Sequence, residues 1–188
     1  MEGAIATLVV LGLMAAVVLL FRRFVRRPAR VSQEDPPGVR TVVTFSGTDP
    51  ELFEDDKEDE PLVGVRLFRM LCDGLTAGQI AVESRGTIQN AQRAECVVGG
   101  ERFALVLEWI DRTWVASVEW VPETAAEKRH LALTQQVFAP PDGPALRQLL
   151  SALDRWLKAQ PQLAHVRWFR KERWIAKDTS DPSDGPVR

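Results

Sequence analysis

The stretch that decides the fold is ECVVGGERFALVLEWIDRTWVASVEWV, residues 95–121. Gly99-Gly100 and Asp111-Arg112 divide it into three runs in which side chains alternate between two faces. A glycine pair between alternating runs is typical of a two-residue hairpin turn, because glycine readily adopts positive φ angles. Both faces carry apolar residues. We therefore expect an antiparallel meander with one face on a helix and the other only partly exposed to solvent.

Two amphipathic helices are predicted, one before and one after this meander in the sequence. Residues 144–159 place apolar side chains at three- and four-residue spacings, and Pro161 ends the pattern. Residues 142–144 are typical of a helix N-terminus, because Asp142 is a capping candidate and Pro144 is favoured in a first helical turn. Residues 62–75 form a second apolar stripe, with Val63, Leu67, Phe68, Leu71, Cys72 and Leu75 at helical spacing.

The remaining elements are less strongly marked. Residues 39–45, 131–138 and 165–175 are strand candidates, the last as a strand or a strand-like arm. Residues 122–129 form a loop or one or two helical turns, and residues 77–90 show no clear period. The sum is an α+β fold with a mostly antiparallel β-sheet packed with about two helices.

An uncharged segment near the N-terminus, residues 3–21, predicts a single transmembrane helix. As a helix it extends roughly 28 Å, close to the ~30 Å of a bilayer core. Eleven of its residues are Ile, Leu, Val or Phe, which favour insertion by roughly 3 to 7 kcal/mol. A cleaved signal peptide and a buried soluble helix are the alternatives. The run is long for a signal peptide, and arginines stand where a cleavage site would be.

Arginines follow the apolar segment and predict its orientation. Residues 1–30 contain five arginines against one acid, and all five come after Phe21. Because basic flanks stay in the cytoplasm, we expect the N-terminus outside and the following domain in the cytoplasm, at a bacterial inner membrane. Gly12 and Ala16 would allow two such helices to pack as a homodimer. The candidate contacts to lipid headgroups are Arg22, Arg23, Arg26 and Arg27.

The chain is thus predicted to have four parts. Residues 1–27 are the transmembrane anchor with its basic flank, and residues 28–61 are a proline-rich and acidic linker that includes the candidate strand 39–45. Residues 62–176 are the cytoplasmic domain, and residues 177–188 are a disordered tail. Seven acids crowd the end of the linker, and we expect them to stay solvated. Calcium binding and docking onto the arginines or a basic partner are the alternatives.

Composition and motifs narrow the function classes. Residues 61–188 carry seventeen basic and fifteen acidic side chains, which argues against a dedicated nucleic-acid surface. Cys72 and Cys96 lie in apolar runs and predict buried, reduced thiols. They have no metal-site spacing with His130 and His165. Phosphate-binding glycine loops and the hydrolase and metalloprotease motifs are absent from the sequence. We therefore predict no cofactor or metal, and an enzyme would need a site that forms only in three dimensions.

Basic and aromatic residues interleave in HVRWFRKERWI, residues 165–175. Tryptophan and arginine are favoured interface anchors. The same pattern can hold bases or headgroups, or can be a strand whose arginines extend to water. We predict a non-enzymatic, membrane-anchored domain that binds a protein partner, as a scaffold, assembly or immunity-like module. The alternatives are a membrane-tethered enzyme and a lipid- or nucleic-acid-contacting module. The candidate contact residues here are Arg167, Trp168, Arg170, Lys171, Arg173 and Trp174.

Overall fold

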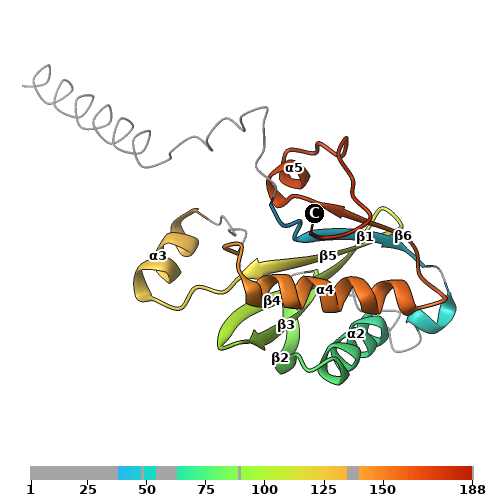
Figure 1. The fold of residues 1–188 in the computed structure, drawn as a ribbon, viewed down its shortest axis with the longest axis horizontal. Coiled ribbons are helices and arrows are strands. Elements are labelled where there is room, and N and C mark those ends of the chain that lie inside the picture. Colours follow the sequence, from blue (N-terminus) through green and yellow to red (C-terminus); the bar gives the residue numbers. More distant parts are fainter. Residues whose placement is uncertain (1–37, 48, 54–62, 89, 135–139, 188) are drawn as a thin grey trace, which may run out of the picture. The chain divides into compact units, whose positions relative to one another are not determined.

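Six antiparallel strands form one sheet in the computed structural model of this chain (Figure 1). They lie within the residues that the structure describes, namely 38–187 apart from 48, 54–62, 89 and 135–139. Their order across the sheet is β2-β3-β4-β5-β1-β6. The strands are β1 (Val42–Ser46), β2 (Ala81–Ile88), β3 (Ala91–Val98), β4 (Glu101–Ile110), β5 (Thr113–Trp120) and β6 (Ala164–Phe169).

The predicted transmembrane segment, residues 3–21, lies outside the described residues, as do the arginines of its basic flank. Among the helices of the described part, none is both long and apolar enough to cross a bilayer. The described chain from Gly38 onward forms one compact unit. That unit includes β1, the candidate strand that the sequence placed in the linker.

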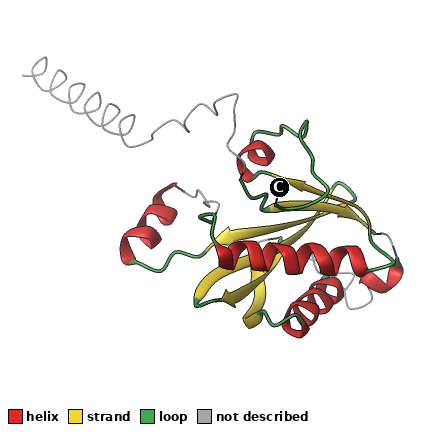
Figure 2. Ribbon diagram, viewed as in Figure 1, coloured by secondary structure: helices red, strands yellow, loops and turns green. Residues whose placement is uncertain are grey.

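Two helices, α2 (Val65–Ala77) and α4 (Pro144–Ala159), cover one face of the sheet, which we call the inner face (Figure 2). The opposite face is the outer face. Shorter elements complete the described fold: the 3-10 turn η1 (Pro50–Phe53) and the helices α3 (Ala125–Thr134) and α5 (Lys171–Ile175). The predicted α+β class and the antiparallel sheet are confirmed. α4 has the predicted bounds, and the leucines of its stripe are buried against the sheet.

Both turns of the meander have the backbone that tight hairpins require. Gly99 and Gly100 have φ angles of +58° and +86°, and Asp111 and Arg112 have +47° and +65°. Positive φ at both central positions matches the twist of the flanking strands. As expected, the inner face is buried and the outer face is partly covered, since Val106 is also buried there.

Trp114, one of the fully buried tryptophans of the inner face, organises the packing at one end of the core. It is fully buried, and its Nε1 donates a hydrogen bond to the carbonyl of Gly47 at 3.0 Å. The rings of Phe53 and Trp109 lie 5.2 Å and 4.5 Å from its ring. Phe53 belongs to η1, at the start of the predicted acidic run, so this part of the run packs on the core. Residues 54–62 lie outside the described part.

The expected strand at residues 131–138 was wrong for 131–134, which belong to α3. The signal for this helix is a capping box. The hydroxyl of Thr124 accepts a hydrogen bond from the Glu127 N–H at 3.2 Å, and the Glu127 carboxylate accepts one from the Thr124 N–H at 2.8 Å. The side chain that caps the helix comes from a stretch whose polarity resembles that of a loop. Residues 135–139 are not among those described.

The ambiguous stretch 77–90 contains the end of α2 and the strand β2. Gln79, with φ +69°, reverses the chain, and the Ile80 N–H donates to the Leu75 carbonyl at 3.0 Å. This is a Schellman-type helix end, in which the apolar Ile80 returns to the core. The strand that follows is almost entirely exposed, so it has no alternation of apolar and polar residues for a sequence pattern to detect.

The segments predicted as a final strand and a disordered tail also differ from expectation. β6 ends at Phe169, and the chain then turns into α5. Residues 177–187 do not extend freely but run back along the sheet, where Ser183 pairs with Trp168. The proline, serine and aspartate content that suggested disorder gives no sign of these backbone contacts, because they join residues distant in the sequence.

Candidate functional site

The basic and aromatic residues at 165–175 are mostly engaged within the fold. Trp168 is fully buried, and its Nε1 donates to the Asp154 carboxylate at 2.8 Å. Lys171 is also buried, and its Nζ lies 2.9 Å from the Glu119 carboxylate. Arg167 pairs with Asp184, and Arg173 lies 3.3 Å from Asp178. Arg170 is half-buried, and the ring of Trp174 packs 5.4 Å from that of Phe169.

These contacts weaken the case for a headgroup- or nucleic-acid-binding surface at this segment. Such a surface needs cations that are available to phosphates. Here three cations face carboxylates of the same chain, and one of the two tryptophans is in the core. The other predicted contacts, Arg22, Arg23, Arg26 and Arg27, lie outside the described residues.

The cysteines are buried free thiols on facing elements of the core, Cys72 on α2 and Cys96 on β3. Burial raises the pKa of Cys72 to about 11 and that of Cys96 to about 12. Both thiols therefore stay protonated near neutral pH, where a thiol is a weak nucleophile and a weak metal ligand. His165 is exposed at the start of β6, and His130 lies in α3. Among the described residues, no group of three histidine, cysteine or acidic side chains could hold a metal.

The two edges of the sheet differ, and this difference is the most informative feature of the described surface. At the β6 edge, the Trp168 N–H donates to the Ser183 carbonyl at 2.8 Å, and the Ser183 N–H donates back at 3.0 Å. We call residues 178–187 the C-terminal strap. It is held further by Arg40, whose N–H donates to the Pro186 carbonyl at 2.8 Å and whose buried guanidinium lies 3.1 Å from Asp181.

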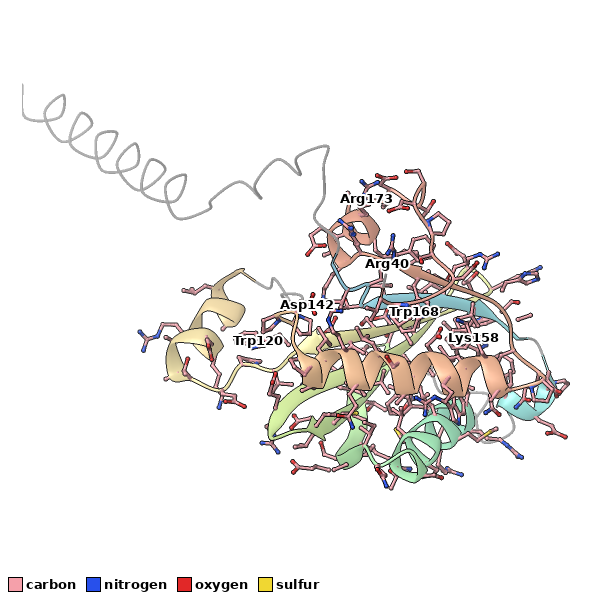
Figure 3. The ribbon with its side chains drawn as sticks, viewed as in Figure 1. Arg40, Trp120, Asp142, Lys158, Trp168 and Arg173 are labelled. Carbon is pink, nitrogen blue, oxygen red and sulfur yellow. The ribbon has the colours of Figure 1, made fainter. Side chains whose placement is uncertain are left out.

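Figure 3 labels Arg40, Lys158 and Trp168, three residues that the strap contacts. A hollow of about 650 Å³ lies between α4 and the strap, and Lys158 and Asp154 are among the residues that line it. These two side chains form an ion pair with each other. The chain thus closes this edge with its own C-terminal residues, which is how many proteins protect an edge strand.

The β2 edge has no such cover in the part of the chain that is described. β2 pairs with β3 on one side, and β2 is the last strand in that direction. Seven of its eight residues are exposed, and Val82 is half-buried. An edge of this kind presents unpaired backbone N–H and C=O groups along its length.

Charged pairs flank the open edge on both faces. Arg85 lies 2.6 Å from Asp73 of α2, on the inner face. Glu83 pairs with Arg102 of β4, on the outer face. The β2–β3 register shifts between Val82 and Ser84, so Glu83 lies at a bulge. Such charges and bulges oppose unselective edge-to-edge aggregation, yet they leave the backbone groups accessible.

A hollow of about 220 Å³ lies at the edge beside Gly86. It is lined by residues 84–88 together with Arg93 and Ala94. Sequence reasoning did not predict this site. The place of Gly86 on an open edge depends on the strand order, which the local sequence pattern does not contain.

Comparison with known proteins does not extend this description, because no protein-family model, curated protein or solved structure matches the chain significantly.

Proposed function

We propose that this protein is a single-pass, membrane-anchored domain that binds another protein through the open edge of β2. The observation that carries the proposal is the contrast between the two edges. The chain uses its own strap to pair Trp168 at the β6 edge, whereas β2 presents eight residues that are nearly all exposed. Binding there would follow the strand-addition mode, in which an extended segment pairs with the backbone of an exposed edge.

The flanking charges would give this binding its selectivity. Backbone pairing supplies affinity that depends little on sequence, while side chains beside the edge distinguish one partner from another. The Glu83–Arg102 pair and the Arg85–Asp73 pair are largely exposed, so each can exchange an internal contact for one with a partner at little net cost. Membrane-bound scaffolds, assembly factors and immunity-like modules all need contacts of this kind.

The proposed anchor is the apolar segment at residues 3–21, with its arginine flank on the cytoplasmic side of a bacterial inner membrane. Residues 22–37 link it to the described domain, and fully extended they would reach at most roughly 55 Å. A tether this short confines the domain to a thin layer near the bilayer. This raises its effective concentration for partners in the same membrane.

Two measurements test this proposal on the full chain in cells. The first is carbonate extraction of membranes, where an anchored protein stays in the pellet and recovery in the wash contradicts anchoring. The second is photo-crosslinking from Thr87→benzoylphenylalanine on β2, with Ser151→benzoylphenylalanine on the exposed side of α4 as the matched control. We expect a distinct crosslinked protein from position 87 only. Identical products from both positions, or none from position 87, contradict binding at the edge.

A further inference from the structure

We infer that Gly86 makes a socket in the β2 edge for an aromatic side chain, carried by an extended segment of a different protein that adds as a seventh strand. This inference rests on the proposed binding at the β2 edge and goes further by naming the side chain that the partner places there. It is carried by the shape of the edge, by the residues around Gly86, and by the poor fit of a second copy of this chain.

The shape of the edge is the first step. A Cβ atom placed on Gly86 would have no atom within 4 Å, and its φ is not in the positive range. Neither crowding nor backbone strain therefore requires glycine here, although glycine weakens a strand interior. The hollow of about 220 Å³ lies beside this position. An edge glycine of this type is stabilised when an aromatic ring from a neighbouring strand covers it.

The residues around the hollow suit such a ring. Ile88 lies two residues after Gly86 on the same face of the strand. It is 49% exposed, so it offers an apolar surface that a partner could bury. Arg93 lies opposite Gly86 in the β2–β3 register and points to the outer face. Its guanidinium lies 3.4 Å from Glu95, which holds it near the hollow. A ring over Gly86 would bury the side of Ile88 and contact the guanidinium, an arrangement that favours aromatic over aliphatic groups.

A second copy of β2 fits this edge poorly in the registers centred on Gly86, Arg85 or Ser84. In a two-fold antiparallel pair centred on Gly86, glycine faces glycine and the hollow stays empty. Centred on Arg85, arginine faces arginine, which is destabilising. Centred on Ser84, Glu83 faces Arg85 of the other copy. Their side chains, however, lie on opposite faces, as their contacts on β4 and α2 show. A partner of different sequence is therefore favoured over a second copy in these three registers.

The probe is a nine-residue peptide of alternating threonine and valine with phenylalanine at its centre, compared with the same peptide carrying alanine there. Each is labelled, given lysines at its ends for solubility, and titrated against the full-length protein in detergent by fluorescence anisotropy. We expect the phenylalanine peptide to bind about three- to tenfold more tightly than the alanine peptide.

The decisive variant is Gly86→Val, which places a side chain in the hollow beside the strand. A β-branched residue suits a strand better than glycine, so Tm should stay equal or rise. The preference for phenylalanine should fall to about one. Ala81→Val is the matched control, because it places the same side chain at an exposed position of the same strand, outside the lining of the hollow, and should keep the preference.

Three results overturn the inference: equal binding of the two peptides, an unchanged preference in Gly86→Val, or dimerisation of the protein that Gly86→Val abolishes. The third would assign the edge to a second copy. If position 87 crosslinks to a partner while the peptides show no preference, the socket is wrong and the proposed function stands. If carbonate removes the protein from membranes while the preference holds, the anchor is wrong and the socket stands.

Discussion

At the scale of single residues, Gly64 and Trp114 show how closely the core is fitted. Gly64 precedes α2 with a φ of +84°, and a Cβ there would lie 2.5 Å from the Trp114 ring. Trp114 is enclosed by Phe53 and Trp109 and fixed by its hydrogen bond to Gly47, so it cannot move aside without breaking other contacts. Glycine is needed here for both its backbone angle and its size.

Gly64→Ala should therefore lower the free energy of unfolding by about 2–4 kcal/mol, through backbone strain and overpacking together. Gly100→Ala is the matched control. Its φ is also positive, at +86°, but nothing lies within 4 Å of its Cβ position. This control should show the strain alone, about 1 kcal/mol. Urea unfolding monitored by tryptophan fluorescence measures both. Equal losses in the two variants would show that the Trp114 contact costs nothing.

Glu108 predicts a pH effect from the outer face. Burial raises the pKa of its half-buried carboxyl, and the negative charge of Glu119 raises it further. Because the folded pKa lies above the unfolded one, the associated stability is fully present below the unfolded pKa, about 4.3. It is lost as pH rises through the folded pKa.

Glu108→Gln should consequently raise the urea midpoint at pH 7 and leave it nearly unchanged at about pH 3.5, where glutamate in the parent protein is protonated. Glu101→Gln on the same strand, at an exposed position, serves as the control and should change neither value appreciably. A gain of equal size at both pH values would mean that the side chain acts through packing and not through its charge.

At the scale of elements, the C-terminal strap acts as a partial seventh strand at the β6 edge. Its backbone exchanges two hydrogen bonds with Trp168. These two bonds distinguish the β6 edge from the β2 edge, which has none of this kind among the described residues. The strap is distant in sequence from β1, yet it contacts Arg40 just before that strand. The two ends of the described domain are thus bound to one another.

Ser183→Pro removes the N–H that donates to Trp168 and should destabilise the fold by roughly 1–3 kcal/mol. Ser183→Ala keeps both backbone bonds and should stay close to the parent protein. Hydrogen exchange at the Trp168 amide provides the local readout, and it should accelerate in the proline variant alone. Unchanged exchange there would show that the strap does not protect the edge.

The same scale shows which elements could be predicted from sequence. α4 was predicted at about its observed bounds because its leucines repeat at helical spacing and the core buries all of them. The β3–β4–β5 meander was predicted because its turns are marked by Gly99-Gly100 and Asp111-Arg112. β2 was missed because an exposed strand has no apolar period. The helical part of 131–138 was missed because the Thr124–Glu127 capping box lies in a stretch with the polarity of a loop.

At the scale of the whole molecule, the candidate site could not be predicted, because it depends on which strands end the sheet. Sequence reasoning favoured residues 165–175 for their arginines and tryptophans. In the fold, Lys171 and Trp168 are buried with partners on β5 and α4. The open edge belongs instead to β2, whose residues carry no conspicuous chemistry. Strand order sets this difference, and strand order depends on contacts between distant parts of the chain.

The position of β1 between β5 and β6 has a consequence for biosynthesis. Among the described strands, β1 leaves the ribosome first, yet its neighbours, paired at Ser117 and Phe169, are translated long afterwards. At about 5–20 residues per second, the nascent chain carries β1 unpaired for several seconds. With the proposed anchor, this interval is spent at the translocation machinery. β6 pairs with β1 only after residue 169 has been translated, so a polypeptide that terminates before β6 leaves this side of β1 exposed to chaperones and proteases.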